Sequence, residues 1–434
     1  MLTFDEILPA IREALAGHAK ALEGLEWLLV NRDLYGRVRL IAPEVSQENE
    51  IVRGALERLA TELANWLGPH AYPAEAAILY ESDRELACQG AATVPLEGLA
   101  NVWLADRLAS EGDWAQIAPE TQGARRIVFF SIKGGVGRST ALAATAWWLA
   151  QAGKRVLVLD LDLESPGLSS SLLPPDRQPR YGITDWLVED LVDNANTVFE
   201  SLVATSGLSR DGEIYVVPAH GADPGEYVTK LGRVWMPKVQ PDGMREPWSA
   251  RLQRLLRALE ARIQPDVVLI DSRAGIDEVA SACLTDLGAN LVLLFALEGS
   301  QTWTGYRILF EHWRRAGVAE LVRERLQLVA ATTPDTEVRL QYLEALRENG
   351  YDLFASSLYD EIEPGETVGD RWHFEAAMDA APHAPWEVRW HQSLVGLRSL
   401  HGRLTEIDAD AVRAIFGPLI EGIVQTSGLE NGNV

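Results

Sequence analysis

The segment FFSIKGGVGRST, residues 129–140, combines three closely spaced glycines with hydroxyl side chains. Glycines let backbone N–H groups approach phosphate oxygens without obstruction, and the N-terminus of a following helix adds partial positive charge. The apolar run RIVFF precedes the glycines and the helical pattern STALAATAWWLAQAGK follows them. This context predicts a phosphate-binding loop in which Ser139 ligates magnesium and Thr140 donates to an inner phosphate. The alternative is a glycine-rich turn of purely structural use.

The loop departs from the usual pattern at Arg138, where such loops nearly always carry lysine. Arginine is permanently charged and grips phosphate oxygens bidentately, but it is bulkier and carries its charge on a planar fork. Binding can survive this change, because backbone amides and magnesium carry much of it. We expect the positioning of a terminal phosphate, on which hydrolysis depends, to be affected.

Three carboxylates follow apolar runs further along the chain. Asp160 and Asp162 end the stretch RVLVLDLD, and Asp271 ends DVVLID. Acidic residues beside a phosphate site need a cation or a water molecule to act on. Each aspartate alone is more often a helix cap or a loop residue, but three of them at strand ends behind a phosphate loop favour a functional role.

The elements that must position these residues form an alternating pattern. Short runs rich in Val, Ile and Leu alternate with helical stretches after about residue 120; the runs are RIVFFS, RVLVLD, EIYVVPA, DVVLID, NLVLLFAL and RLQLVAAT. Continuous apolar strands separated by helices predict a parallel sheet covered on both faces, with ligands at the carboxyl ends of its strands. We therefore expect an α/β fold, a doubly wound, mostly parallel sheet over residues 121–434, with insertions near 172–212 and 222–248.

Residues 1–120 read as a small acidic α/β domain. A helical spacing of apolar residues runs from about Phe4 to Val30, RVRLIA and AAILYE resemble strands, and ENEIVRGALERLATELANWLG predicts a helix ending at Gly68. Catalytic residue types do not gather in this part of the chain. A regulatory or partner-binding module is our first interpretation, and a structural extension of the main domain is the second.

The composition of the chain argues against several classes of partner and site. The formal net charge of −24 argues against a broad surface for DNA or anionic lipid. Cys88 and Cys283 stand alone and suggest neither a disulfide nor a zinc site. The apolar helical face from Val412 to Val424 has acidic neighbours, so we expect it to pack on the domain rather than on a membrane. Without an apolar run of membrane-spanning length or a basic N-terminal start, the sequence favours a cytoplasmic protein.

KGGVGRST resembles the deviant Walker A motif of the ParA/MinD class of P-loop ATPases. DSRAGID is similar to the Walker B motif of the MinD branch, DLDLESPG to its acidic A′ motif, and EIYVVPAHG to a strand common in the class. The resemblance covers roughly residues 125–400 and is specific in the three phosphate motifs. The spelling KGGVGR suggests a separate branch, which is associated with bacterial conflict, antiviral defence and signalling systems.

The resemblance implies a role for each motif residue. The nucleotide-binding residues would be Lys133, Gly134, Gly135, Val136, Gly137, Arg138, Ser139 and Thr140. ATP with Mg²⁺ would be the cofactor, with Ser139 as the direct ligand of the metal and Asp160 and Asp271 in its outer shell. Asp162 would orient the attacking water, and Lys133 would reach the phosphates of a partner subunit across a nucleotide-dependent homodimer. Lys133, Asp162 and Arg138 are thus the catalytic candidates.

Two departures from the class affect these expectations. Arg273 replaces the usual proline after the Walker B aspartate, and TTPDTE follows the strand LQLVAA without the asparagine that commonly reads adenine. His220, after the strand EIYVVPA, is a further candidate for contact with a ligand or partner. The dispersed tryptophans, Trp390 among them, fit either a core or an interface.

Three functions remain open from the sequence. The first is a slow, dimerising ATPase switch that signals to partner proteins, with residues 1–120 as the region that binds an unidentified partner. The second is a scaffold or sensor that binds nucleotide without hydrolysing it. The third is a DNA-partitioning ATPase, against which the net charge argues. Retention of both Asp160 and Asp162 favours the first, since a site that only binds nucleotide has no need of a water-orienting carboxylate.

Overall fold

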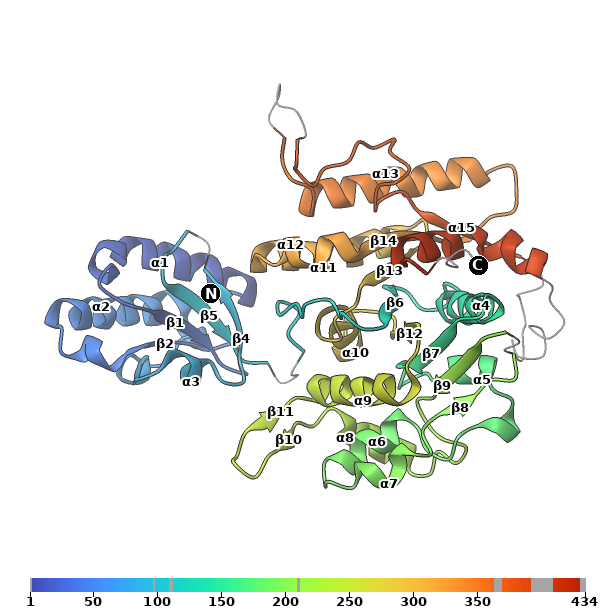
Figure 1. Cartoon of the computed structure of the whole chain (residues 1–434). Helices are drawn as coiled ribbons and strands as arrows, with labels where there is room; N and C mark the ends of the chain where they lie inside the picture. Colours follow the sequence, from blue (N-terminus) through green and yellow to red (C-terminus); the bar gives the residue numbers. More distant parts are fainter. Residues whose placement is uncertain are drawn as a thin grey trace. The chain divides into compact units, whose positions relative to one another are not determined.

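The computed structural model describes residues 2–96, 98–108, 112–208, 211–362, 369–391 and 409–429. Two compact units make up the chain, and each contains its own main sheet (Figure 1). The smaller unit comprises Met1–Gln116 together with Arg315–Gly317, and the larger unit comprises Ile117–Arg314 and Val318–Val434.

An eight-stranded sheet forms the centre of the larger unit. Its strands are β6 (Arg125–Ser131), β7 (Arg155–Asp160), β8 (Ala204–Thr205), β9 (Glu213–Val217), β12 (Val267–Asp271), β13 (Leu291–Ala296), β14 (Leu326–Thr333) and β15 (Trp386–Arg389). Their order in space is β15-β14-β13-β6-β12-β7-β9-β8, and all neighbours pair in parallel except β8 and β9. The predicted α/β fold with a mostly parallel sheet is confirmed.

Helices cover both faces of this sheet. Ile127 and Phe129 of β6 pack with α4 (Arg138–Gln151) and α15 (Ala409–Ser427) in one apolar core. Phe130, whose side chain points to the opposite face because strand residues alternate, contacts Tyr306 of α11 (Ser300–Ala316). The remaining helices include α5 (Leu168–Leu172), α6 (Ile183–Asp190), α7 (Ala195–Phe199), α9 (Trp248–Ile263), α10 (Glu278–Ser281), α12 (Ala319–Val322) and α13 (Arg339–Ser357).

The apolar face predicted near the C-terminus is buried in α15. Val412, Phe416 and Ile423 of this helix belong to the core shared with α4 and the sheet, so the prediction that it packs on the domain is confirmed. Over the part of the chain that the structure describes, no helix has the length and apolar character needed to cross a membrane.

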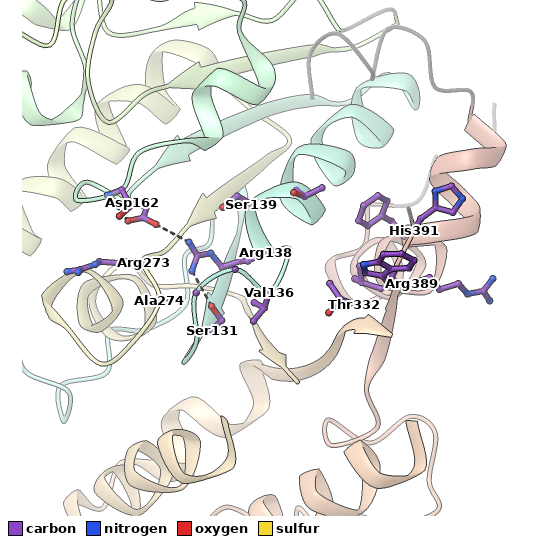
Figure 2. A pocket seen from close by; sticks show the side chains of 18 residues that line it. Ser131, Val136, Arg138, Ser139, Asp162, Arg273, Ala274, Thr332, Arg389 and His391 are labelled. Atoms are coloured by element: carbon purple, nitrogen blue, oxygen red, sulfur yellow. Dashed lines mark hydrogen bonds and ion pairs between the residues drawn. The ribbon is translucent and has the colours of Figure 1, made fainter. Parts of the chain in front are cut away.

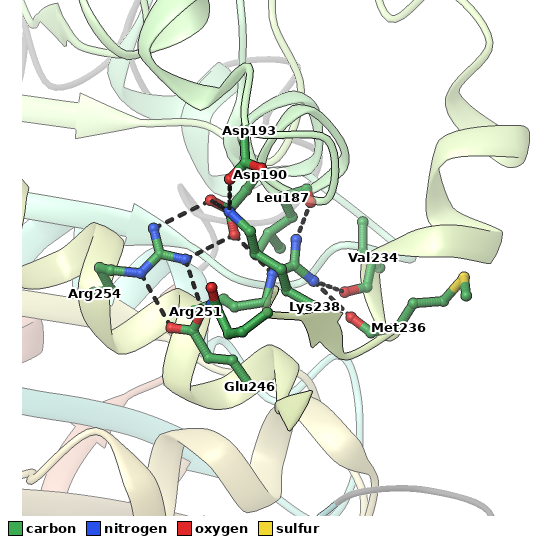
Figure 3. Close-up of polar contacts among 10 residues, drawn as sticks. Leu187, Asp190, Asp193, Val234, Met236, Lys238, Glu246, Arg251 and Arg254 are labelled. Carbon is green, nitrogen blue, oxygen red and sulfur yellow. Dashed lines mark hydrogen bonds and ion pairs between the residues drawn. The ribbon is translucent and has the colours of Figure 1, made fainter. Parts of the chain in front are cut away.

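A buried polar cluster holds the insertion near residues 222–248 (Figure 3). This insertion contains α8 (Tyr227–Val234) and a hairpin of β10 (Lys238–Val239) and β11 (Arg245–Glu246). Asp190, at the end of α6 and 1% exposed, accepts hydrogen bonds from Arg251 Nε at 2.9 Å and Arg254 Nη2 at 2.8 Å. Arg251 in turn donates to the carbonyl oxygens of Leu187 and Met236. Lys238 of β10, within the insertion, also donates from Nζ to Oδ1 of Asp190 at 3.4 Å, so this carboxylate ties the insertion to α6 and α9.

The smaller unit has a five-stranded sheet in the order β3-β2-β1-β5-β4. Its strands are β1 (Leu28–Arg32), β2 (Val38–Pro43), β3 (Ile78–Glu81), β4 (Ala92–Pro95) and β5 (Val102–Asp106), and its helices are α1 (Ile7–Leu22), α2 (Glu50–Leu67) and α3 (Arg84–Cys88). Helix α2 begins after Asn49, whose side chain accepts from two backbone N–H groups, and ends at Gly68, as predicted.

The helix predicted from Phe4 to Val30 is wrong beyond Leu22. Residues Leu28–Arg32 form the central strand β1, which is buried along its whole length and pairs with β2 and β5. The apolar residues Leu25 and Leu29 that extended the helical spacing are therefore buried in the sheet region, because tertiary pairing overrides local periodicity.

Candidate nucleotide-binding site

The glycine loop connects the central strand β6 to helix α4. Gly135 and Gly137 adopt positive φ angles of 74° and 80°, a backbone region that side chains with a Cβ disfavour. Among the described residues, no acceptor is hydrogen-bonded to the backbone N–H groups of residues 134–137. These donors, next to the N-terminus of α4, are available to a bound anion.

A pocket of about 760 Å³ opens beside this loop (Figure 2). Residues 134–140 form one wall of it, and Asp162, Arg273 and Ala274 lie near one end. Another wall is formed by Thr332 of β14, by Val388, Arg389, Trp390 and His391 at and just after the end of β15, and by Phe416 of α15. The pocket thus joins the predicted phosphate loop to an apolar and aromatic surface from the distant C-terminal part of the chain.

The three predicted carboxylates meet at one edge of the sheet. Asp160 and Asp271 are direct neighbours in the pairing of β7 with β12, and both are buried. Burial, together with the charge of Asp271, raises the pKa of Asp160 to about 7. Oδ1 of Asp160 and Oδ2 of Asp271 are buried without a hydrogen-bond partner. Asp162 lies two residues further along, lines the pocket and is only partly buried.

Arg138 points toward these carboxylates. Its Nε donates to Oδ1 of Asp271 at 2.7 Å, its Nη1 to Oγ of Ser131 at 3.2 Å, and its Nη2 to Oδ2 of Asp162 at 3.4 Å. The side chain is nearly buried but still forms part of the pocket wall. Other loops carry a lysine that contacts phosphate at this position. Here Arg138 occupies it and forms ion pairs with Asp162 and Asp271.

Ser139 and Thr140 line the pocket, as a role in phosphate or metal binding requires. Lys133 is exposed, is not among the residues that line this pocket, and forms no ion pair or side-chain hydrogen bond within the described parts of the chain. The structure therefore brings all the predicted site residues to one region, with Lys133 at its outer side and Asp160 and Asp271 beneath it.

Sequence reasoning missed the aromatic wall of the pocket, which consists of Trp390, His391 and Phe416. Trp390 and His391 directly follow β15, and Phe416 lies on α15, more than 240 residues beyond the glycine loop. Thr332 reaches the same pocket from a register shift at the end of β14, where its φ angle is 48°. In the sequence, Trp390 was noted only among the dispersed tryptophans, because residues so far apart along the chain leave no local pattern.

Arg273, identified in the sequence only as a departure from a motif, also lines the pocket. Its guanidinium pairs with Glu164 at 2.6 Å and with Asp277 at 3.0 Å. His220, by contrast, is not among the residues that line the pocket; its ring packs edge-on against Tyr227 and its Nδ1 lies 2.8 Å from the carbonyl oxygen of Gly221.

The oxygen atoms at this edge suit a hard cation held together with phosphate. Within the described ranges, no group of three or more His, Cys, Asp and Glu side chains is arranged to hold a metal ion by itself. The Ser139 hydroxyl in the pocket and the unpartnered oxygens of Asp160 and Asp271 behind it are nevertheless of the type that Mg²⁺ prefers.

Comparisons with known proteins find several chains that are similar to parts of this one. An Aquifex aeolicus protein named as an arsenical pump-driving ATPase is 46% identical over 55 residues, which span 13% of this chain and 14% of that relative. The structure of pNOB8 ParA bound to nonspecific DNA shares 16% identity and a TM-score of 0.43, over 70% of this chain and 99% of that one. Cobyrinic acid a,c-diamide synthase from Mycobacterium smegmatis was solved with an ATP analogue and magnesium. It shares 20% identity and a TM-score of 0.37 with this chain, over 56% of this chain and 86% of that one.

A family model describes most of the larger unit. The model of the CobQ/CobB/MinD/ParA nucleotide binding domain matches residues 127–371, a range that contains the glycine loop and all three aspartates. Because this range is more than half of the 434 residues, the chain belongs to the CobQ/CobB/MinD/ParA nucleotide-binding domain family.

Proposed function

We propose that the chain is a nucleotide-dependent molecular switch that binds Mg-ATP in the pocket beside residues 134–140, dimerises, and hydrolyses ATP slowly to signal to partner proteins. One observation carries this proposal: free backbone donors at the N-terminus of α4 face the same pocket as Asp162, behind which Asp160 and Asp271 end their strands. Donors suit the phosphates, and a carboxylate beside them suits an attacking water.

The size and the far wall of the pocket support a nucleotide rather than phosphate alone. A pocket of about 760 Å³ is large for an inorganic anion and within the range of small-molecule sites. The side chains of Trp390 and Phe416 provide aromatic and apolar surface of the kind on which a nucleobase stacks.

Magnesium would be held by Ser139 and the phosphates, with Asp160 and Asp271 near its outer shell, and it would neutralise charge that develops during phosphoryl transfer. The chain itself would supply the remaining functions. Asp162 would orient a water molecule. Lys133, which is exposed and has no side-chain partner among the residues that the structure describes, would be available to a second subunit.

The non-hydrolysing sensor remains the second candidate, and a specific observation favours it. Arg138 engages Asp162 and Asp271, the carboxylates that hydrolysis would use.

Partner signalling through residues 1–120, in a bacterial defence system, is the context that the KGGVGR resemblance supports.

The dimerising switch is tested by sedimentation with Mg-ATP or Mg-ADP, together with phosphate release at increasing protein concentration. We expect dimers with ATP only, specific activity that rises with concentration, and a persistent dimer in the Asp162→Ala variant. Equal dimerisation by ATP and ADP without phosphate release would instead support the sensor. A low-salt DNA shift assay separates the DNA-partitioning alternative, which the charge of −24 disfavours.

Replacing Trp390 by alanine is expected to weaken nucleotide binding about 10- to 100-fold, since stacking of a base on an aromatic side chain is worth about 1–3 kcal/mol. Titration with a fluorescent ATP analogue measures the effect. Trp390→Phe should retain most of the affinity. Trp66→Ala is the matched control, because Trp66 is 39% exposed, close to the 44% of Trp390, but lies on α2 of the smaller unit. Equal affinity of Trp390→Ala and native protein would contradict a stacking role.

A further inference from the structure

The guanidinium of Arg138 points toward Asp162 and Ser131 (Figure 2), and it also contacts Asp271, so it bridges two carboxylates that a metal would need. Nε and Nη2 of Arg138 contact Asp271 and Asp162 at 2.7 and 3.4 Å. Nη1 donates to Oγ of Ser131, the last residue of β6. Each of the three guanidinium nitrogens thus donates a hydrogen bond at this edge of the sheet, two to carboxylates and one to a serine hydroxyl.

This contact is an ion pair with little access to water. The side chains of Arg138 and Asp271 are 7% and 1% exposed, so neither charge is well solvated. Burial alone would lower the pKa of Arg138, but the charge of Asp271 and a hydrogen bond to it raise that pKa above its ordinary value. The guanidinium therefore stays charged, and separating the pair would leave an uncompensated charge in a buried place.

Arginine is suited to this bridge in a way that lysine is not. Its planar fork holds several donors in fixed directions and can serve two carboxylates at once, whereas an ammonium group is a single point of charge. Only one oxygen of Asp271 is occupied; the other, Oδ2, is buried without a partner. A cation that reaches Asp271 must share this carboxylate with Arg138 or displace it.

We propose that Arg138 is an internal counter-ion that competes with divalent metal for Asp271 and Asp162, so that the site binds nucleotide phosphates with little dependence on metal. This inference rests on the proposed nucleotide-binding function. Arg138 acts as a positioning residue, since it holds the two carboxylates until a divalent cation displaces it. Hydrolysis then requires more Mg²⁺ than binding does.

Two measurements test the competition without relying on turnover. The first is Mn²⁺ binding to the nucleotide-free protein, followed by electron paramagnetic resonance. We expect R138K to bind Mn²⁺ about tenfold or more tightly than the native protein, because lysine cannot keep both carboxylates bridged. R126K is the matched control: Arg126 is also buried in an ion pair, with Glu260, but lies at the opposite end of β6. Its Mn²⁺ affinity should equal that of the native protein.

The second measurement compares the affinity for fluorescent ADP in Mg²⁺ and in EDTA. Removing metal should change the native affinity less than about threefold, but should weaken R138K about tenfold or more. The native comparison needs no variant, so it decides even if R138K folds poorly. A large loss in EDTA for the native protein, or equal Mn²⁺ affinity of native and R138K protein, overturns the inference. Failure of ADP to bind in either buffer overturns the proposed function instead, while the Mn²⁺ comparison still decides the role of Arg138.

Discussion

Replacing Lys133 by alanine is expected to reduce phosphate release by about 10³-fold or more, the scale on which a cation supplied by a second subunit accelerates phosphoryl transfer. Nucleotide binding to the monomer should change little, because Lys133 is exposed and is not among the pocket-lining residues of its own chain. Phosphate release and equilibrium binding are measured on the same preparations. Lys154→Ala is the control: Lys154 lies just beyond the other end of α4 and also forms no side-chain ion pair among the described residues.

Mixing two inactive variants distinguishes action within one subunit from action across the dimer. If Lys133 serves the partner's nucleotide, a dimer of one Lys133→Ala and one Asp162→Ala subunit contains one site with both groups intact. In an equal mixture, half of the dimers contain one subunit of each variant, and each of these dimers has one complete site out of two. The mixture should therefore recover up to about a quarter of the native rate. A mixture as inactive as its components would mean that Lys133 acts on its own subunit or not at all.

Replacing Asp190 by alanine is expected to destabilise the insertion near residues 222–248 by about 3–5 kcal/mol, the usual effect of removing one partner of a buried ion pair. Arg251, with no exposed side-chain surface, would keep its charge without a counter-ion. Hydrogen exchange of α8 and α9 measures this local effect, which a global unfolding curve of a two-unit chain would average. Asp193→Ala is the control, because Asp193 also pairs with Lys238 but its side chain is 85% exposed. We expect that variant to lose less than about 1 kcal/mol.

The same cluster predicts a dependence on pH. Burial alone would raise the pKa of Asp190, but hydrogen bonds from Arg254 and Arg251 hold it below its ordinary value. A carboxylate with a lowered folded-state pKa stabilises the fold at every pH above its unfolded value, about 3.9, and this stability is lost as the pH falls toward the folded-state value. Protection of α8 and α9 against exchange should therefore decline in acid in the native protein and show less such decline in the Asp190→Ala variant.

The fold of the larger unit could be predicted from the sequence because the strands of its sheet are buried on both faces. Apolar residues follow one another without interruption in the middle of β6, β7 and β12, and they are buried as such runs predict. In the smaller unit, sequence pattern and structure disagree. Leu29 continued a helical spacing, yet it lies in a strand that pairs with β2, directly after the turn at residues 33–37, and with β5, about 70 residues further along the chain. The parallel pairing with β5, which places β1 at the centre of the sheet, is the part that no local pattern encodes.

The polar half of the site was predictable for a similar reason. Gly135 lies on the loop after β6, Ser139 in the first turn of α4 and Asp271 at the end of β12, so their meeting follows from the parallel sheet and its first connection. Two features were beyond such reasoning. The aromatic wall depends on where β15 and α15 pack, and the direction of Arg138 depends on which of two neighbouring acceptors, phosphate or carboxylate, its guanidinium finds.

The pairing of Asp160 with Asp271 across β7 and β12 sets a limit on motion during any reaction cycle. Adjacent strands stay about 4.8 Å apart as long as their ladder is intact, so the backbones that carry these two aspartates keep a fixed spacing. If the chain binds nucleotide as proposed, we expect movement beyond the strand ends, in the Arg138 side chain, the segment that carries Asp162 and the turn that carries Arg273. A spectroscopic label at one of these positions is then expected to report nucleotide binding relative to the fixed strands of the sheet.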